Sequence, residues 1–277
     1  MSEIKFDYRI DSELPAHPES PAALGPKFLD TLDALSRIDP AIFTNWKILV
    51  RPDIGKVLEE AERIGTAAAA EKIEIYSPEE ARSRIVAIVE NNVTRGDLRE
   101  PMPHQGYSLI AYTGDVVESR SIGLRMKAGG KVDGDTRLEI GDYKTLPDPA
   151  LVTHSLFKAA LLAINTNWPP CWACAYAYRM GFDKSPLFPG AELFPFSVFR
   201  IPWLGYLSAP LAAGLALPSE ILTERTPDSG LLMSATEERL DPTVPEHWRR
   251  ARMIADIMIA RKSDSKSSRP IGAPGAN

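Results

Sequence analysis

The chain has 277 residues, of which 44% are hydrophobic and 25% are charged. This composition is ordinary for a globular protein and excludes collagen, a coiled coil and a wholly disordered chain. Lys and Arg number 32 against 37 Asp and Glu, giving a net charge of −5 at pH 7, with the acidic excess in the first hundred residues. Binding to nucleic acid depends mainly on neutralising phosphates, so we do not expect this chain to bind it.

The first residues and the cysteines indicate a compartment. The opening sequence MSEIKFDYRI is charged and lacks the apolar run of a secretory signal. Cys171 and Cys174 are the two cysteines and provide no disulfide framework. Residues 201–217 are uncharged, but prolines and glycines interrupt a stretch that is short for a membrane-spanning helix. We expect a cytoplasmic protein without a membrane partner, with a buried strand and then a buried helix over 201–217.

Three helices have clear start signals. Ser77-Pro78-Glu79-Glu80 matches a capping box, and prolines in Asp148-Pro149 and at Pro245 are typical of a first helical position. Apolar residues at helical spacing are expected to face the core. They are Ala81, Ile85, Ile88, Val89, Leu156, Phe157, Ala160, Leu161, Ile164, Trp248, Ala251, Ile254, Ala255 and Met258. We expect weaker helices over 27–37 and 56–70, and a loop over 17–26.

Alternating patterns predict the strands. Residues 6–10 alternate apolar and charged side chains, and three runs separated by turns predict an antiparallel meander over 106–113, 121–127 and 136–140. Further strands are expected over 171–178, 197–201, 220–225 and 230–236, the last two joined by a turn at 226–230.

The order of these elements predicts the fold class. Strands do not alternate regularly with helices, so we expect an α+β fold with a mixed, largely antiparallel sheet and helices packed on it. One domain is expected over residues 1–262. The remaining residues, 263–277, are rich in Ser, Gly and Pro and are expected to be a disordered tail.

Two short motifs could form a redox, metal-binding or catalytic site. Cys171-Trp-Ala-Cys174 lies in an alternating run, and positions three apart on a strand face opposite sides about 10 Å apart, too far for a disulfide. No second pair completes a zinc site, so we expect two structural cysteines. Asp142-Tyr143-Lys144 follows a predicted strand, and such an acid-x-Lys triplet could hold a divalent metal that activates water. A metal-dependent nuclease using Asp142 and Lys144 is therefore the alternative enzymatic hypothesis.

The last third of the chain carries a family resemblance. The segments that carry it are WLGYLS at 203–208, DSGLLMSATEERL at 228–240, PEHWRRA at 245–251 and NWPPCW at 167–172, with the pair Phe43 and Trp46 nearer the start. Together they resemble the immunity protein 52 family of bacterial polymorphic toxin systems, over roughly residues 25–262.

The resemblance implies an α+β protein that is not an enzyme and has no catalytic residues, cofactor or metal. Such a protein is encoded beside a toxin, often a nuclease effector with a restriction-endonuclease-like domain delivered by type VI secretion. It neutralises this cognate toxin by forming a tight complex with it. We expect that complex to work by steric and electrostatic occlusion, in which acidic side chains of the immunity protein pair with toxin bases. The candidate interface acids are Glu59, Glu60 and Glu62, followed by Glu237, Glu238 and Asp241. For each of them a merely solvated surface residue is the alternative.

Overall fold

The computed structural model of the protein describes residues 5–50, 74–95, 100–113, 118–141, 145–179 and 200–267. Its strands form one sheet in the order β3-β2-β4-β5-β6-β1-β7-β8-β10-β9. The strands are β1 (Phe6–Leu14), β2 (Trp46–Leu49), β3 (Ile75–Tyr76), β4 (Tyr107–Thr113), β5 (Ile122–Ala128), β6 (Gly134–Ile140), β7 (Trp172–Arg179), β8 (Arg200–Leu207), β9 (Leu222–Arg225) and β10 (Leu231–Ser234). The helices are α1 (Pro21–Ile38), α4 (Pro78–Arg82), α5 (Ile85–Asn91), α6 (His154–Asn167), α7 (Ala209–Ala212) and α8 (Pro245–Ser267).

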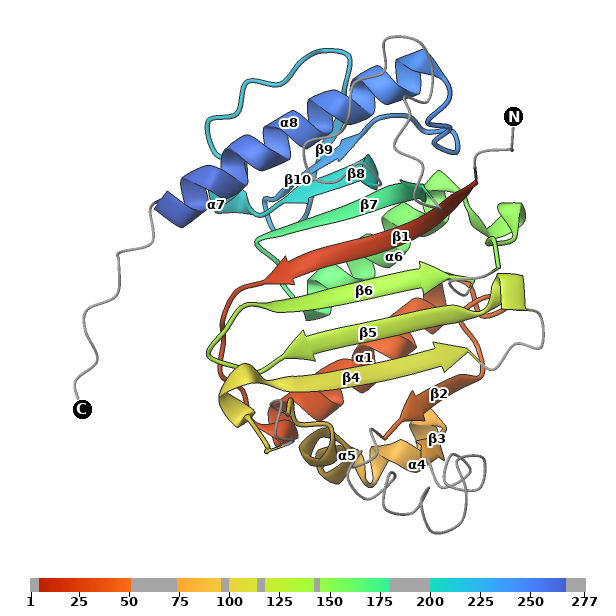
Figure 1. Ribbon diagram of the computed structural model, residues 1–277, viewed down its shortest axis with the longest axis vertical. Coiled ribbons are helices and arrows are strands. Elements are labelled where there is room, and N and C mark those ends of the chain that lie inside the picture. The colour runs from red at the N-terminus through yellow and green to blue at the C-terminus, as the bar shows by residue number, and fades with distance from the viewer. Residues whose placement is uncertain are drawn as a thin grey trace.

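The sheet confirms the predicted α+β class. Every pairing between the described strands is antiparallel, and β4, β5 and β6 form the predicted meander. The largest departure from sequential order is β1, which lies between β6 and β7 in the middle of the sheet (Figure 1), and β3 and β9 lie outside β2 and β10 at the two edges. Buried hydroxyls mark this long-range pairing, because Ser12 Oγ and Thr136 Oγ1 are 2.5 Å apart.

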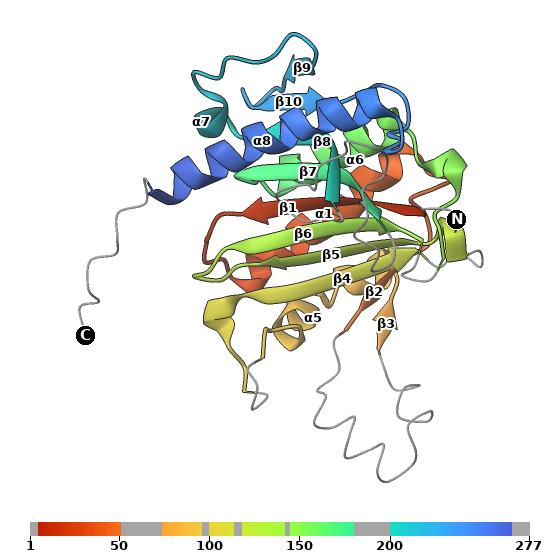
Figure 2. The ribbon, with the colours of Figure 1, turned by 45° about the horizontal axis from the view of Figure 1, so that its top comes forward.

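Helices pack on both faces of the sheet. In Figure 1, α1 and α6 lie behind the strands, whereas α8 lies in front of the upper strands. Figure 2 shows the sheet between these two layers of helices. Close approach of α8 to β8 depends on Gly205. A Cβ atom there would lie 2.7 Å from Ile254 Cγ2 and 2.8 Å from Met258 Sδ, closer than carbon and sulfur atoms pack.

An aromatic cluster joins α6, β1 and β8 in the core. The ring of Trp203 lies 5.4 Å from that of Phe157 and 6.0 Å from that of Tyr8. The buried indole nitrogen and hydroxyl of this cluster both have hydrogen-bond acceptors. Trp203 Nε1 donates to Thr236 O at 3.0 Å, and the Tyr8 hydroxyl donates to Leu240 O at 2.6 Å. The residues expected to face the core are all buried except Trp248, which is half-buried.

Several predicted boundaries were wrong. A loop was expected over 17–26, but α1 begins at Pro21, a first helical position that needs no amide hydrogen, with Ser20 as the N-cap. The helix expected to open at Asp148-Pro149 begins at His154, where Thr153 Oγ1 accepts the Leu156 amide at 3.3 Å. Asp148 instead caps a single 3-10 turn over 149–151.

Three further predictions concern the capping box at Ser77, the C-terminal tail and the helix over 56–70. The capping box at Ser77 is confirmed, although the helix it opens stops at Arg82 and a second one starts at Ile85. Helix α8 runs to Ser267, past residue 263, where the tail was expected to begin. The helix expected over 56–70 lies outside the described residues.

Candidate functional site

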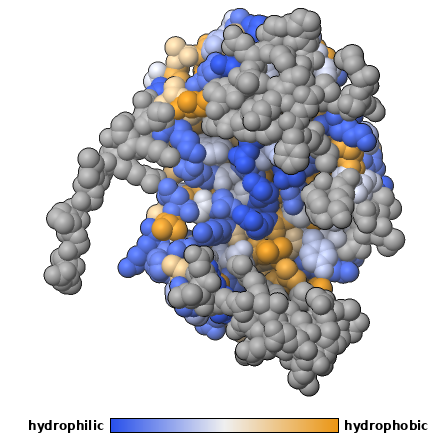
Figure 3. All heavy atoms as spheres, in the orientation of Figure 1, coloured by the Kyte–Doolittle hydropathy of each residue, from blue (hydrophilic) through white to orange (hydrophobic). Residues whose placement is uncertain are grey.

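The side of the sheet turned away from α1 and α6 is polar. Side chains of a strand alternate between its two faces, and the apolar ones of β1 are buried towards the helices. We call the opposite side of the middle strands the open face. Its side chains are Asp7, Arg9, Asp11, Glu13, Arg125, Lys127, Asp135, Arg137, Glu139, Trp172, Cys174, Tyr176 and Tyr178. In Figure 3 hydrophilic side chains gather across the middle of this face, and Figure 1 shows no described helix in front of the middle strands.

A cluster at the centre of the open face is organised around Asp11. Arg137 lies directly opposite Asp11 on the neighbouring strand and donates from Nε and Nη2 to its two carboxylate oxygens, at 2.8 and 3.2 Å. The Tyr176 hydroxyl donates to Asp11 Oδ2 at 2.8 Å, and Arg200 Nη1 lies 3.6 Å from the same oxygen. The Asp11 side chain is only 11% exposed. Its carboxylate is therefore held by three strands and is not available to a substrate.

Cations lie over aromatic rings along β7. The Arg9 guanidinium is 5.0 Å from the Tyr178 ring centroid, and Arg200 is 5.3 Å from that of Tyr176. At the end of the strand, Lys262 of α8 is 4.5 Å from the Trp172 ring and donates to Glu13 Oε2 at 2.6 Å. Such contacts fix long side chains in one position, so the open face presents its charges in a defined arrangement.

Burial and charge pairing set the protonation of the open face. Burial raises the pKa of Asp7 above its ordinary value, against the lowering effect of the Arg9 guanidinium bonded to it at 2.7 Å. The hydrogen bond to Asp11 raises the pKa of Arg137, and burial raises that of Tyr176. Arg137 is therefore charged and Tyr176 is protonated at neutral pH.

A hollow of about 520 Å³ lies over one end of the open face. It extends from the cluster around Asp11 to the turn between β5 and β6, with Lys262 of α8 at its side. Its charged lining residues are Asp11, Glu13, Arg125, Asp133, Asp135, Arg137, Arg200 and Lys262. Four of these are acidic and four are basic, so the hollow suits a partner that carries both signs of charge.

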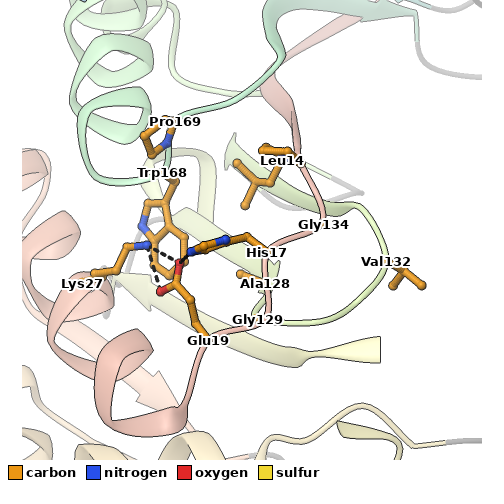
Figure 4. A pocket seen from close by; sticks show the side chains of 11 residues that line it. Leu14, His17, Glu19, Lys27, Ala128, Gly129, Val132, Gly134, Trp168 and Pro169 are labelled. Atoms are coloured by element: carbon orange, nitrogen blue, oxygen red, sulfur yellow. Dashed lines mark hydrogen bonds and ion pairs between the residues drawn. The ribbon is translucent and has the colours of Figure 1, made fainter. Parts of the chain in front are cut away.

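A second hollow of about 250 Å³ lies at the same end of the sheet, on the helix side, and is drawn in Figure 4. Its walls include Leu14, Val132 and Pro169. Its charged groups bind one another, because Lys27 Nζ donates to both Glu19 carboxylate oxygens, at 2.8 and 3.0 Å, and lies 4.7 Å from the Trp168 ring. This stack secures the start of α1 to the end of α6 and leaves an apolar recess.

Those predicted interface acids that the structure describes do not lie on the open face. Glu59, Glu60 and Glu62 lie outside the described residues. Glu237 and Glu238 are exposed in the segment after β10, where the Glu238 amide donates to Thr236 Oγ1 at 3.2 Å. Asp241 is half-buried and accepts the Thr243 amide at 2.9 Å, so its carboxylate shapes the turn before α8.

The sequence interpretation missed the open face, although β1 carries a signal for it. Asp7, Arg9, Asp11 and Glu13 are charged at every second position. On a strand this spacing places all four on one side. A central strand with such a row indicates a sheet face that is polar rather than covered by an apolar layer.

The enzymatic alternative has no structural description. Asp142 and Lys144 lie outside the described residues. Among the residues that are described, no group of three or more His, Cys, Asp or Glu side chains could hold a metal ion. Cys171 and Cys174 do not form a disulfide with each other, and burial raises the pKa of Cys174 far above its ordinary value.

The uncharged stretch over 201–217 folds as expected into a strand and a short helix, β8 and α7. In the part of the chain that the structure describes, no helix combines the length and apolar character needed to cross a bilayer.

Comparison with known proteins gives a structural neighbour. A solved structure of a Pseudomonas aeruginosa T6SS protein aligns with 90% of this chain and 74% of its own, at 13% sequence identity and a TM-score of 0.44. No family model matches the chain, and no curated protein matches it. Membership of the immunity protein 52 family therefore stays a prediction.

The motifs that carry the family resemblance have structural roles in this chain. Trp203 belongs to the aromatic core, and Phe43 stacks on Trp46 with the rings inclined by 14°. The Tyr206 hydroxyl donates to the Asp228 carboxylate, which also accepts the Gly230 amide at 3.2 Å. Burial acts to raise the pKa of Asp228, but the hydrogen bonds from Thr226, Tyr206 and Gly230 outweigh it and hold the pKa below its ordinary value. These residues secure the β9–β10 turn against β8.

Proposed function

We propose that the chain is an immunity protein that binds a cognate protein toxin and neutralises it by steric and electrostatic occlusion, without catalysing a reaction. The toxin would be a nuclease effector of a type VI or related secretion system, and the complex would form in the cytoplasm. The proposal needs no cofactor, metal, nucleic acid or membrane.

The observation that carries the proposal is the open face with its fixed, paired charges. A stable interface buries about 800 Å² on each partner, and the open face spans four neighbouring strands with side chains held by ion pairs and rings. A preorganised surface loses little side-chain freedom on binding, so more of its contact energy contributes to affinity. Fixed charges of both signs favour one partner over others, because a misplaced partner brings like charges together.

Growth rescue tests this proposal. The product of the neighbouring gene is expressed in a bacterial host with the wild-type chain, with a frameshifted copy, or alone, and survivors are counted. We expect survival only with the wild-type chain, and co-elution of the two proteins after purification. Equal killing in all three strains would refute an immunity role.

A cleavage assay tests the enzymatic alternative separately. Purified chain is incubated with plasmid and Mg²⁺ or Mn²⁺, beside the Lys144→Ala variant. We expect intact plasmid in both reactions. Cleavage that the variant loses would establish the metal-dependent nuclease instead.

A further inference from the structure

We infer that the hollow on the open face is a receptor for a carboxylate, and that its occupant is an Asp or Glu side chain of the bound protein partner. The carboxylate would lie among the guanidinium groups of Arg125, Arg137 and Arg200, which we call the arginine trio. This inference rests on the proposed function, since it names what the partner presents to the open face.

Two members of the trio are placed against each other by the strand register. Arg125 lies directly opposite Arg137 in the β5–β6 pairing. Side chains at such positions have Cβ atoms about 5 Å apart, and two like charges there destabilise the sheet. Each arginine is partly neutralised by an acid, Arg137 by Asp11 and Arg125 by Asp135 at 3.6 Å. An anion between the two guanidinium groups would relieve the remaining repulsion.

The trio also has hydrogen-bond donors to spare. A guanidinium has five N–H donors. Arg137 uses Nε and Nη2 on Asp11. The guanidinium groups of Arg125 and Arg200 make ion pairs at 3.6 Å with Asp135 and Asp11, and neither group hydrogen-bonds to a described residue. Their side chains are 52% and 42% exposed, so these donors are accessible from the hollow.

Three of the four acids around the hollow already accept hydrogen bonds. Asp11 accepts three hydrogen bonds, from Arg137 and Tyr176. Glu13 accepts from Lys262 at 2.6 Å, and Asp133 accepts the Ala16 amide at 3.1 Å. The fourth acid, Asp135, is 45% exposed and pairs with Arg125 at 3.6 Å. The guanidinium groups therefore have unused donors, although the formal charge of the hollow is balanced. Planar guanidinium groups match a carboxylate in geometry as well as in charge.

The surroundings favour a protein carboxylate over a phosphate chain. Nucleic acid presents a continuous row of phosphates, and its affinity grows with the number neutralised. Here Glu13, Asp135 and Glu139 flank the trio, and the whole chain has a net charge of −5. A track of phosphates would meet these acids on leaving the trio, whereas one carboxylate on a protein surface would not.

A peptide titration tests the inference without the partner. The probe is an acetylated and amidated peptide of four glutamates, with the four-glutamine peptide as its matched control. Binding is followed by the Nε–Hε resonances of arginine in the full chain. We expect millimolar binding of the glutamate peptide that shifts Arg125 and Arg200 and leaves Arg82 unchanged. Arg82 is the matched reference because it is 58% exposed and has one acidic partner, Asp33 at 3.1 Å.

Variants locate the site. The Arg125→Gln/Arg200→Gln double variant should weaken binding of the glutamate peptide by at least about tenfold, the equivalent of 1.4 kcal/mol, and Arg82→Gln should leave it unchanged. Equal binding of the glutamine peptide, or equal binding by the double variant, would overturn the inference. Tighter binding of inorganic phosphate or of a twelve-residue oligothymidylate would overturn it in favour of a phosphate site.

Growth rescue separates this inference from the proposed function. If the wild-type chain protects and the double variant protects equally well, the function stands and the carboxylate receptor does not. If the chain fails to protect while its arginine trio binds the glutamate peptide, the receptor stands and the immunity role does not.

Discussion

Arg137 and Asp11 lie 126 residues apart in the sequence, yet they form a two-pronged pair between adjacent strands, at 2.8 and 3.2 Å. The pair ties β6 to β1, and the Tyr176 hydroxyl adds β7 through the same carboxylate. One nearly buried acid thus orients an arginine, a tyrosine and the middle of the open face.

Removing this acid should be costly. Asp11→Ala leaves the Arg137 guanidinium and the Tyr176 hydroxyl without their shared acceptor, and we expect the free energy of unfolding to fall by about 2–3 kcal/mol. The free energy of unfolding is measured by urea denaturation monitored by circular dichroism. Asp135→Ala is the control, because that side chain is 45% exposed and its surface ion pair contributes below about 1 kcal/mol. Equal small losses for both variants would contradict a structural role for Asp11.

The turn that follows β9 provides a second prediction. Tyr206→Phe removes the hydroxyl that donates to Asp228, and we expect a loss of about 1–2 kcal/mol because the bond involves a charged acceptor. Asp228→Asn should cost a similar amount. In the double variant the two losses should not add, and a coupling of at least about 0.5 kcal/mol is expected for residues in direct contact. Strict additivity would show that the bond contributes little.

His154 should make stability depend on pH. Burial, and then the charge of Lys158, lower the pKa of its imidazole below the ordinary value of 6.5, and Nε2 lies 3.1 Å from Ser234 Oγ. The unfolded chain therefore takes up this proton at a higher pH than the folded chain does. Stability is fully present above pH 6.5 and is lost as the pH falls below it towards the folded pKa.

Replacing the imidazole tests that dependence. His154→Gln should flatten the decline in Tm between about pH 7 and pH 5, because the group that binds the proton is gone. His104→Gln is the matched control, since His104 is exposed in the 3-10 turn over 103–105. The same decline in Tm for wild type and His154→Gln would rule out this histidine as the cause.

Gly205 sets how closely α8 packs on β8. Gly205→Ala forces its new Cβ into Ile254 and Met258, and we expect a loss of about 1–3 kcal/mol, as in other overpacked cores. Gly123→Ala on β5 is the control, because its nearest neighbour would be Glu139 Cγ at 3.5 Å, an ordinary contact. That variant should change stability by less than about 0.5 kcal/mol, or raise it. Thermal unfolding of both variants provides the comparison.

The two cysteines should differ in reactivity. Cys174 is buried with a raised thiol pKa, whereas Cys171 is half-buried. Since the thiolate is the reactive form, a disulfide reagent such as Ellman's should label about one thiol per folded chain and two in urea. Cys171→Ser should abolish the labelling of the folded chain. Labelling of Cys174 without denaturant would show that the β7 region opens.

Periodic patterns predicted most of the elements. Alternation located β4, β5 and β6 and their antiparallel order, and the stripe of Leu156, Phe157 and Leu161 identified the buried side of α6. The capping box at Ser77 was correct because both of its hydrogen bonds are local. The helix starts predicted at Pro78 and Pro245 were correct, and the one at Pro149 was wrong because a proline also suits a single 3-10 turn.

The candidate site was harder to predict because it depends on contacts between distant parts of the chain. Asp11 and Arg137 become neighbours only when β1 inserts beside β6, and nothing in the local pattern of either strand specifies that pairing. The interface acids predicted from the sequence, such as Glu59, Glu60 and Glu62, are like charges that lie close together along the chain. In the structure the organised charges are of both signs and come from the separate strands β1, β5, β6 and β8.

The position of β1 has a consequence for folding. It precedes every other described strand in the sequence, but it joins the β3-β2-β4-β5-β6 half of the sheet to the β7-β8-β10-β9 half. The two halves cannot form a continuous sheet until β7 has paired with it across most of the chain. Distant pairing of this kind slows folding, because loop closure must precede the contacts that compensate for it. A deletion confined to residues 6–14 would therefore separate the molecule along its middle, leaving two incomplete sheets with exposed edges.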